Sequence, residues 1–405
     1  MTKPLVLVDE KLSLAARLLA SDAEVRTFPG RSLSASDPVL GEASGLVVRS
    51  ITTVDAALLA AAPRLQVVAS ATVGLEHVDS LAALQRHVEV RHAPGCNAPG
   101  VADWVTAAMV ADMSARGRKP REMTLGIVGA GHTGSAVAAR ARRLGMEVRL
   151  SDPPRAARDP DFCDHSLDEV LACDVVSLHA PATTSRVSRW PTMGLLNERT
   201  LALIPDNALI INAARGALVD ESALLAALAS GRGLVAAIDT WRGEPRPCAA
   251  LVAGAWRATP HVAGQTVEGK ARGQTRAAEG VAEILGLNPA PVPRGAPRAA
   301  EWRRVDLSGA GRSALDALAL ILSRATGLVE VERALRACVA TGAPFDEVRD
   351  SHARHDLEAV RYSAEGTLPD GLEELLGAVG IGWGESRGAG IALLLAGLLS
   401  AEEGD

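Results

Sequence analysis

Short apolar runs alternate with Ala- and Leu-rich stretches over most of the chain, and this alternation limits the fold more than any other feature. Runs such as 5–9 and 208–214 are apolar nearly throughout, which is typical of strands buried on both faces of a parallel sheet. Because parallel strands need a crossover between them, the pattern predicts an α/β protein with helices on both faces of its sheets. The expected strands are 5–9, 24–28, 45–49, 65–71 and 88–93 in a first unit, and 124–131, 147–152, 174–180, 208–214, 234–240 and 256–264 in a second. The clearest expected helices are 12–20, 55–61, 99–114, 134–145, 220–230 and 266–286.

A change of composition near residue 287 indicates a further domain. Residues 287–298 contain four prolines, which resist helix formation and favour a linker. We therefore expect two doubly wound parallel-sheet domains, of Rossmann or flavodoxin type, with a cleft between them, followed by a small C-terminal α+β domain. The expected boundaries are 1–98 together with 264–286 for the first domain, 99–263 for the second, 287–298 for the linker, 299–384 for the third domain and 385–405 for a C-terminal tail.

Composition excludes several functions. Six Trp, three Phe and one Tyr in 405 residues leave few rings for stacking on bases, and a net charge of −6 gives no electrostatic case for nucleic acid as a partner. The five cysteines are scattered without a CxxC pair, so neither a disulfide framework nor a metal site is predicted. No apolar run approaches the roughly 20 residues of a membrane span. We expect a cytoplasmic protein without a membrane partner.

A glycine-rich loop predicts a dinucleotide cofactor. Gly129, Gly131 and Gly134 form a GxGxxG pattern with His132 and Thr133 between the last two, directly after an expected strand and before an expected helix. The first glycine allows the tight turn, the second lets the backbone approach a diphosphate, and the third lets helix and strand pack closely.

An acid follows at the usual distance along the chain. Asp152 ends the next expected strand, where a carboxylate accepts hydrogen bonds from ribose hydroxyls and repels a 2′-phosphate. The sequence therefore favours NAD over NADP. Arg155 nearby could hold a 2′-phosphate, so NADP stays open as the alternative cofactor.

Polar side chains follow three later strands of the same expected sheet. Arg215, Asp239 with Glu244, and His261 come after these strands, so we expect them at one carboxyl edge. A His removes a hydroxyl proton near neutral pH, a Glu paired with it raises its pKa, and an Arg binds a carboxylate. This set is suited to oxidising an alcohol beside a nicotinamide.

The motifs GAGHTG, NAARGALVDE, DTWRGEP and TPHVAG resemble the D-2-hydroxyacid dehydrogenase family. VVRSIT, ATVGLEHVD, APGCNA, EGKARG and FDEVRDSH resemble, within it, a subfamily that oxidises 4-phospho-D-erythronate in vitamin B6 biosynthesis. The resemblance implies a substrate-binding first domain, an NAD-binding second domain and a homodimer formed through the third domain.

The resemblance also implies roles for individual residues. Arg215, Glu244 and His261 are expected to be catalytic, with His261 as the proton acceptor. The expected cofactor contacts are Gly129, Gly131, His132, Thr133, Gly134, Asp152, Ala180, Asp239 and Gly264. Ser50 and Thr72 are expected to bind a small phosphorylated 2-hydroxy acid, and Gln265 is also expected to contact it. The residues themselves add that Arg49 beside Ser50, and Lys270 or Arg272 nearby, offer positive charge for its phosphate.

Two positions depart from the subfamily pattern. Gln265 stands where a substrate-contacting Tyr is usual, and Ala180 stands where a Thr is usual. A related dehydrogenase acting on another acid, such as 3-phosphoglycerate, therefore stays open as an alternative. A protein that binds NAD(H) as a sensor without turnover is the alternative of another class, and the Arg–Glu–His set argues against it.

Overall fold

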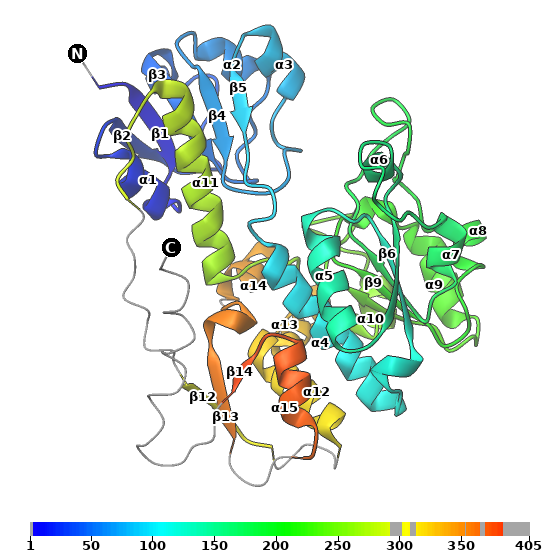
Figure 1. The fold of residues 1–405 in the computed structure, drawn as a ribbon. Helices are drawn as coiled ribbons and strands as arrows, with labels where there is room; N and C mark the ends of the chain where they lie inside the picture. Colours follow the sequence, from blue (N-terminus) through cyan, green and yellow to red (C-terminus); the bar gives the residue numbers. More distant parts are fainter. Residues whose placement is uncertain (1–2, 292–301, 308–312, 353, 365–368, 384–405) are drawn as a thin grey trace.

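The computed structural model describes residues 3–291, 302–307, 313–352, 354–364 and 369–383. Figure 1 shows three bodies: the N-terminal body in blue, a second in cyan and green, and a third in yellow to red between their lower ends. Most of the expected linker, from residue 292 on, and the expected tail 385–405 lie outside the described residues.

The first body is a five-stranded parallel sheet in the order β2-β1-β3-β4-β5. Its strands are β1 (Leu5–Asp9), β2 (Glu24–Phe28), β3 (Ala43–Val48), β4 (Val67–Ser70) and β5 (Glu89–Arg91), joined through α1 (Ser13–Leu19), α2 (Ala56–Ala61), α3 (Ser80–Gln85) and the short η1 (Pro38–Glu42). All five residues of β1 are buried, as expected for a central strand covered on both faces. Helix α11 (Val267–Leu285), which comes much later in the chain, packs on β3 and β4 beside α1.

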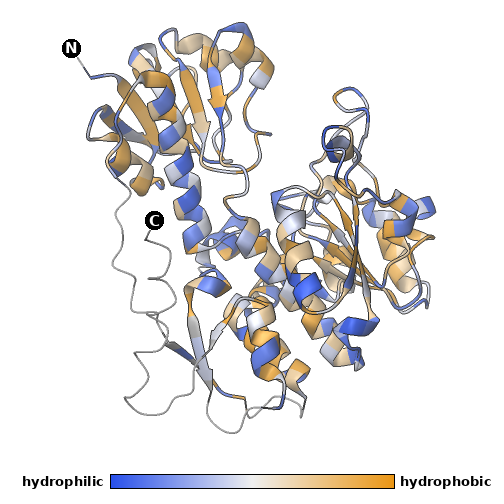
Figure 2. Cartoon of the chain, viewed as in Figure 1, coloured by the Kyte–Doolittle hydropathy of each residue, from blue (hydrophilic) through white to orange (hydrophobic). Residues whose placement is uncertain are grey.

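The second body is a six-stranded parallel sheet in the order β11-β10-β9-β8-β6-β7. Its strands are β6 (Thr124–Val128), β7 (Glu147–Ser151), β8 (Val175–Leu178), β9 (Leu209–Asn212), β10 (Val235–Ile238) and β11 (Arg257–Ala258). Its other elements are η2 (Pro120–Glu122), α5 (His132–Arg143), α6 (Pro153–Ala156), α7 (Leu167–Leu171), α8 (Glu198–Leu201), η3 (Gly216–Leu218), α9 (Glu221–Ala229) and α10 (Ala249–Gly254). Figure 2 shows apolar strands inside both larger bodies and hydrophilic helix faces outside.

The strand expected at 256–264 is much shorter in the structure, where β11 spans only Arg257–Ala258. β11 ends at Ala258 because Pro260 has no N–H to donate and His261 has a positive φ of 57°, which turns the chain out of the sheet. The expected doubly wound class of both sheets is confirmed.

Helix α4 (Ala98–Arg116) joins the first body to the second. It packs against α5 on one side and against α12 of the third body on another, so it is buried on nearly its whole circumference. A helix covered in this way has no single hydrophilic stripe, and the acidic side chains that it does carry, Asp103 and Asp112, are buried.

The third body is a small α+β unit. Strands β12 (Trp302–Val305), β13 (Arg361–Ala364) and β14 (Gly382–Trp383) form a parallel sheet, with helices α12 (Ala314–Thr326), α13 (Leu328–Thr341), α14 (Phe345–Ser351) and α15 (Leu372–Ala378) and the short η4 (Leu357–Ala359). Helix α14 ends at Ser351, and His352 and His355 follow it outside the helix.

Among the described residues no helix is long and apolar enough to cross a membrane. Within the same residues no group of three or more His, Cys, Asp or Glu side chains is arranged to hold a metal ion.

Candidate active site

The glycine-rich loop lies between β6 and α5, as its position in the sequence predicts. Gly129 has a φ of 93°, and a Cβ there would lie 2.7 Å from the backbone N of Ala180. A Cβ on Gly134 would lie 2.0 Å from the carbonyl oxygen of Gly129. A Cβ on Gly131 would meet no heavy atom within 4 Å, so this side of the loop is open. The first and third glycines are therefore required by internal packing, whereas the space at the second fits an approaching diphosphate.

His132 and Thr133 begin α5 directly after Gly131, in the first turn, where backbone N–H groups have no partner within the helix. The His132 ring also packs on Gly95, in the segment that leaves the first body: a Cβ on Gly95 would lie 2.6 Å from it. The loop is thus in contact with the connection between the two bodies.

Asp152 lies just after β7 beside this loop. One carboxylate oxygen accepts a hydrogen bond from the Ala130 N–H at 2.8 Å, and the other accepts one from the Arg155 N–H at 2.9 Å. The Arg155 guanidinium donates to the Ala130 carbonyl at 3.0 Å and lies over the Phe162 ring, 4.4 Å from its centroid. The arrangement holds an acidic side chain beside the glycine-rich loop, and the expected contact of Asp152 with the cofactor stays a prediction.

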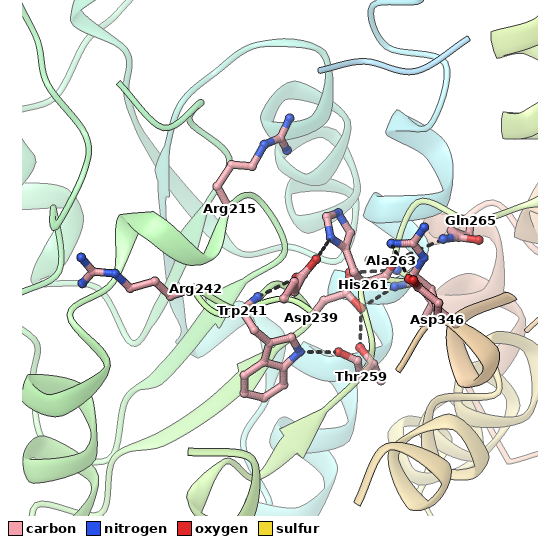
Figure 3. Close-up of polar contacts among 12 residues, drawn as sticks. Arg215, Asp239, Trp241, Arg242, Thr259, His261, Ala263, Gln265 and Asp346 are labelled. Carbon is pink, nitrogen blue, oxygen red and sulfur yellow. Dashed lines mark hydrogen bonds and ion pairs between the residues drawn. The ribbon is translucent and has the colours of Figure 1, made fainter. Parts of the chain in front are cut away.

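His261 and Glu244 form a pair at the end of the sheet (Figure 3). The Nδ1 atom of His261 is 2.8 Å from Oε2 of Glu244, whose other oxygen accepts from the Trp241 N–H at 2.8 Å. Burial lowers the pKa of His261, but the hydrogen bond and charge of Glu244, with Asp239, raise it above its usual value. For Glu244, burial raises the pKa, but its interactions with His261 outweigh burial and bring the pKa below its usual value.

Asp239 fixes the turn that carries His261. Its carboxylate accepts from the Thr259 hydroxyl at 2.5 Å and from the N–H groups of Val262 and Ala263 at 2.8 and 3.0 Å. The His261 N–H donates to the Asp239 backbone carbonyl at 2.7 Å. Because Asp239 is only 1% exposed, burial raises the pKa of its carboxyl despite these bonds. Both oxygens serve the protein itself, and the expected contact of Asp239 with the cofactor stays a prediction.

Arg215 follows β9 and reaches toward the first body. The Asn212 side chain shapes its loop by accepting from the Ala214 N–H at 3.1 Å and donating to the Arg215 carbonyl at 3.0 Å. Gly216 lets this loop lie directly against the Trp241 backbone, because a Cβ there would be 2.0 Å from the Trp241 carbonyl carbon. The loop of Arg215 is thereby brought beside the segment that carries Glu244.

The partner of Arg215 was not anticipated from the sequence. Its Nε donates to Oε1 of Glu76 in the first body at 2.7 Å. Burial raises the pKa of Glu76, but the hydrogen bond and charge of Arg215 lower it below the usual range. Glu76 lies within the ATVGLEHVD segment, yet nothing in that pattern indicates a cation from another domain as its partner.

The expected substrate residues follow neighbouring strands of the first body. Ser50 comes after β3 with an exposed side chain, and Arg49 beside it donates to the buried Asp9 at 2.9 Å. The Thr72 hydroxyl, after β4, lies 2.8 Å from that of Ser70 and donates to the Gly74 carbonyl at 3.1 Å.

The turn after His261 carries the remaining expected residues. The Gln265 side chain donates to the His261 carbonyl at 3.4 Å. The chain passes between the two bodies twice, near Asn97 and near Gly264. A Cβ on Gly264 would lie 2.5 Å from the Asn97 side chain, so the two passages are in contact. The contact of Gly264 with the cofactor stays a prediction, as does that of Ala180.

Residues of the third body brace this turn, which the sequence did not indicate. The buried Arg354 donates to the carbonyls of Gly100 and Ala263, and its own carbonyl accepts from the Val267 N–H at 2.9 Å. Arg272, which the sequence suggested as a phosphate ligand, instead donates to the Cys96 carbonyl at 2.8 Å and to Asp356 at 2.7 Å. The EGKARG segment thus supplies a structural arginine.

Fold and site together define an NAD-dependent oxidoreductase. Residues 97–263 match the model of the D-isomer specific 2-hydroxyacid dehydrogenase NAD binding domain. A relative from Proteus mirabilis, called erythronate-4-phosphate dehydrogenase, is 40% identical over 69% of this chain and 74% of its own. The chain therefore belongs to the D-isomer-specific 2-hydroxyacid dehydrogenase family, which confirms the resemblance seen in its motifs.

Solved structures agree with the fold. The TT0316 protein of Thermus thermophilus has a TM-score of 0.58 at 31% identity, covering 71% of this chain and 99% of that protein. The NAD+-bound 3-phosphoglycerate dehydrogenase of Entamoeba histolytica has a TM-score of 0.58 at 22% identity, over 71% and 96% of the two chains.

Proposed function

We propose that this protein oxidises 4-phospho-D-erythronate to 2-oxo-3-hydroxy-4-phosphobutanoate with NAD, a step of vitamin B6 biosynthesis. The observation that carries the proposal is the His261–Glu244 pair, 2.8 Å apart, at the edge of an NAD-binding sheet. The choice of substrate is supported by the curated relatives, of which the protein from Aeromonas salmonicida is 41% identical and also called erythronate-4-phosphate dehydrogenase.

His261 acts as the base in this proposal. Its Nδ1 faces Glu244, so a proton on Nδ1 leaves the lone pair of Nε2 free to accept the proton of the substrate 2-hydroxyl. Glu244 keeps the ring in place and stabilises the imidazolium that forms. NAD, when bound, accepts the hydride from C2.

Arg215 binds the substrate carboxylate, for which a guanidinium offers two parallel N–H donors. In the structure the Arg215 guanidinium is paired with the carboxylate of Glu76. The carboxylate of the substrate would take the place of the Glu76 carboxylate. Ser50 and Thr72 donate hydrogen bonds to the substrate from the first body. Asp152 accepts from the adenosine ribose and selects NAD against NADP by repelling a 2′-phosphate.

The direct test is the absorbance of NADH during incubation with 4-phospho-D-erythronate, D-erythronate, 3-phosphoglycerate and D-lactate. We expect the first to give the highest kcat/KM, and His261→Ala to lower kcat by about 10²- to 10⁴-fold. Faster turnover of 3-phosphoglycerate would favour the alternative substrate, for which Gln265 in place of Tyr is the reason. Tight NAD binding without turnover of any acid would favour the sensor.

We also infer a homodimer formed through the third body, and action in the cytoplasm. The dimer is supported by the resemblance of FDEVRDSH to the subfamily's dimerisation domain. Light scattering after size-exclusion chromatography is expected to give twice the mass of the 41.9 kDa chain. The mass of a single chain at micromolar concentration would contradict the dimer.

A further inference from the structure

A short helix of the third body lies at the boundary with the first body. Arg31, in the loop after β2, is 2.6 Å from Asp346 of α14. That loop is also next to the expected substrate residues, since a Cβ on the neighbouring Gly30 would lie 2.1 Å from Asp9 and 3.2 Å from Ile51. Asp9 in turn binds Arg49. Helix α14 therefore contacts the loop after β2, and this loop in turn contacts the segment that carries Arg49 and Ser50.

The same helix also approaches the proton-transfer pair. Figure 3 shows Asp346 in the group that contains Gln265 and His261. Arg349 comes three residues later and so lies on the same helix face, close enough for its charge to reach that pair. Burial lowers the pKa of His261, Glu244 and Asp239 raise it, and the charge of Arg349 opposes the two carboxylates.

Among the described residues Arg349 forms two ion pairs but no side-chain hydrogen bond, although its side chain is only 19% exposed. Its ion-pair partners are Asp346 at 3.7 Å and Asp350 at 3.9 Å, and both distances are beyond hydrogen-bond length. Its buried Nε has no hydrogen-bond partner among the described residues. Arg354 of the neighbouring segment, by contrast, donates to two carbonyls.

Lys270, on α11, lies within reach of the charges of both Arg349 and Arg49. Burial lowers the pKa of the Lys270 ammonium on α11, and the positive charges of Arg349 and Arg49 lower it further, while Asp350 opposes them. Lys270 forms no ion pair with any residue that the structure describes. Arg49 is paired with Asp9, and Arg349 has the more distant Asp346 and Asp350 as ion-pair partners. An anion placed beside Lys270 and Arg349 would relieve the repulsion between these two cations.

We propose that Arg349, with Lys270 and Arg49, binds the phosphate of the substrate, so that the third body completes the active site and determines specificity for a phosphorylated acid. This inference rests on the proposed function for its substrate. A guanidinium whose N–H donors form no hydrogen bond within the described residues suits phosphate geometry. Arg349 is thus a substrate-binding residue supplied from outside the two dehydrogenase domains.

The test compares Arg349→Gln and Arg349→Lys with Arg324→Gln, which removes an exposed arginine of α12 in the same body. For Arg349→Gln we expect KM for 4-phospho-D-erythronate to rise about ten- to a hundredfold, with kcat changed less and KM for NAD unchanged. Arg349→Lys keeps the charge and is expected to recover part of the loss. Arg324→Gln is expected to behave as wild type.

Two further readouts separate binding from a structural role. Inorganic phosphate is expected to inhibit the wild-type enzyme competitively against substrate, and about tenfold more weakly in Arg349→Gln. The acid limb of the kcat/KM profile is expected to move to higher pH in this variant, because a cation near His261 has been removed.

The outcomes distinguish the role of Arg349 from the proposed function. Equal losses of kcat/KM on phosphorylated and unphosphorylated acids, or unchanged inhibition by phosphate in a variant with wild-type melting temperature, would overturn the role of Arg349. No turnover of the phosphorylated acid by the wild-type enzyme would instead overturn the proposed function.

Discussion

The turn around His261 and the rim that carries Arg215 are built in opposite ways. The turn is fixed by a buried carboxylate, a buried arginine and a paired glutamate, all within the protein. Arg215 has a partner, Glu76, whose side chain is 62% exposed and which belongs to another body. The groups proposed to move a proton are preorganised, whereas Arg215, proposed to bind the substrate, is held by an exposed contact that a substrate carboxylate could replace. Preorganisation is most valuable where charge develops during the reaction, and exchangeable contacts suit binding and release.

The largest effect is expected from breaking the support of the turn. Asp239→Ala leaves the buried N–H groups of Val262 and Ala263 without an acceptor, which costs about 3 kcal/mol of unfolding free energy. Urea denaturation measures the loss, and kcat is expected to fall with it. Thr259→Val, which removes only the hydroxyl donor to Asp239, is the matched control, with an expected cost of about 1 kcal/mol. Equal losses in both variants would mean that the carboxylate does not organise the turn.

Removing the charge of Glu244 is expected to have an intermediate effect. In Glu244→Gln the pKa of His261 falls, because the charge that raises it is lost. His261 must be neutral to accept a proton, so the acid limb of kcat/KM moves to lower pH and kcat falls by about ten- to a hundredfold. The shift is opposite in sign to the one expected for Arg349→Gln. A limb that stays in place would show that another group titrates.

The same pair gives a pH dependence of stability. The pKa of His261 in the folded protein lies above its unfolded value, so the protonated form stabilises the fold below about pH 6.5. This contribution is lost as the pH rises through the higher folded value. It should be absent from Glu244→Gln, which thermal melts at several pH values would reveal.

The smallest effect is expected at the rim. Glu76→Gln removes an exposed partner of Arg215, so unfolding free energy should change by less than about 1 kcal/mol. We expect KM to fall a few-fold, because the substrate carboxylate no longer displaces a carboxylate of the protein, while kcat is retained. A large loss of kcat would mean that Glu76 positions Arg215 for the reaction.

The sequence by itself determined the two parallel sheets, the glycine-rich loop and the set of Arg215, Glu244 and His261, because strand burial and loop conformation leave local signatures. It also located α11 and assigned it to the first domain, but it did not indicate that α11 packs on β3 and β4 beside α1.

Only the tertiary structure decided which charges meet. Arg215 with Glu76, Arg31 with Asp346, and Arg354 with the carbonyl of Ala263 join residues from different bodies, and side-chain chemistry alone does not choose among the many carboxylates and carbonyls available. Arg272 and Arg349 illustrate this point. Arg272 donates to a backbone carbonyl and to Asp356 at hydrogen-bond distance, which makes it structural. Arg349 has only two ion pairs longer than a hydrogen bond, and its buried Nε has no hydrogen-bond partner among the described residues.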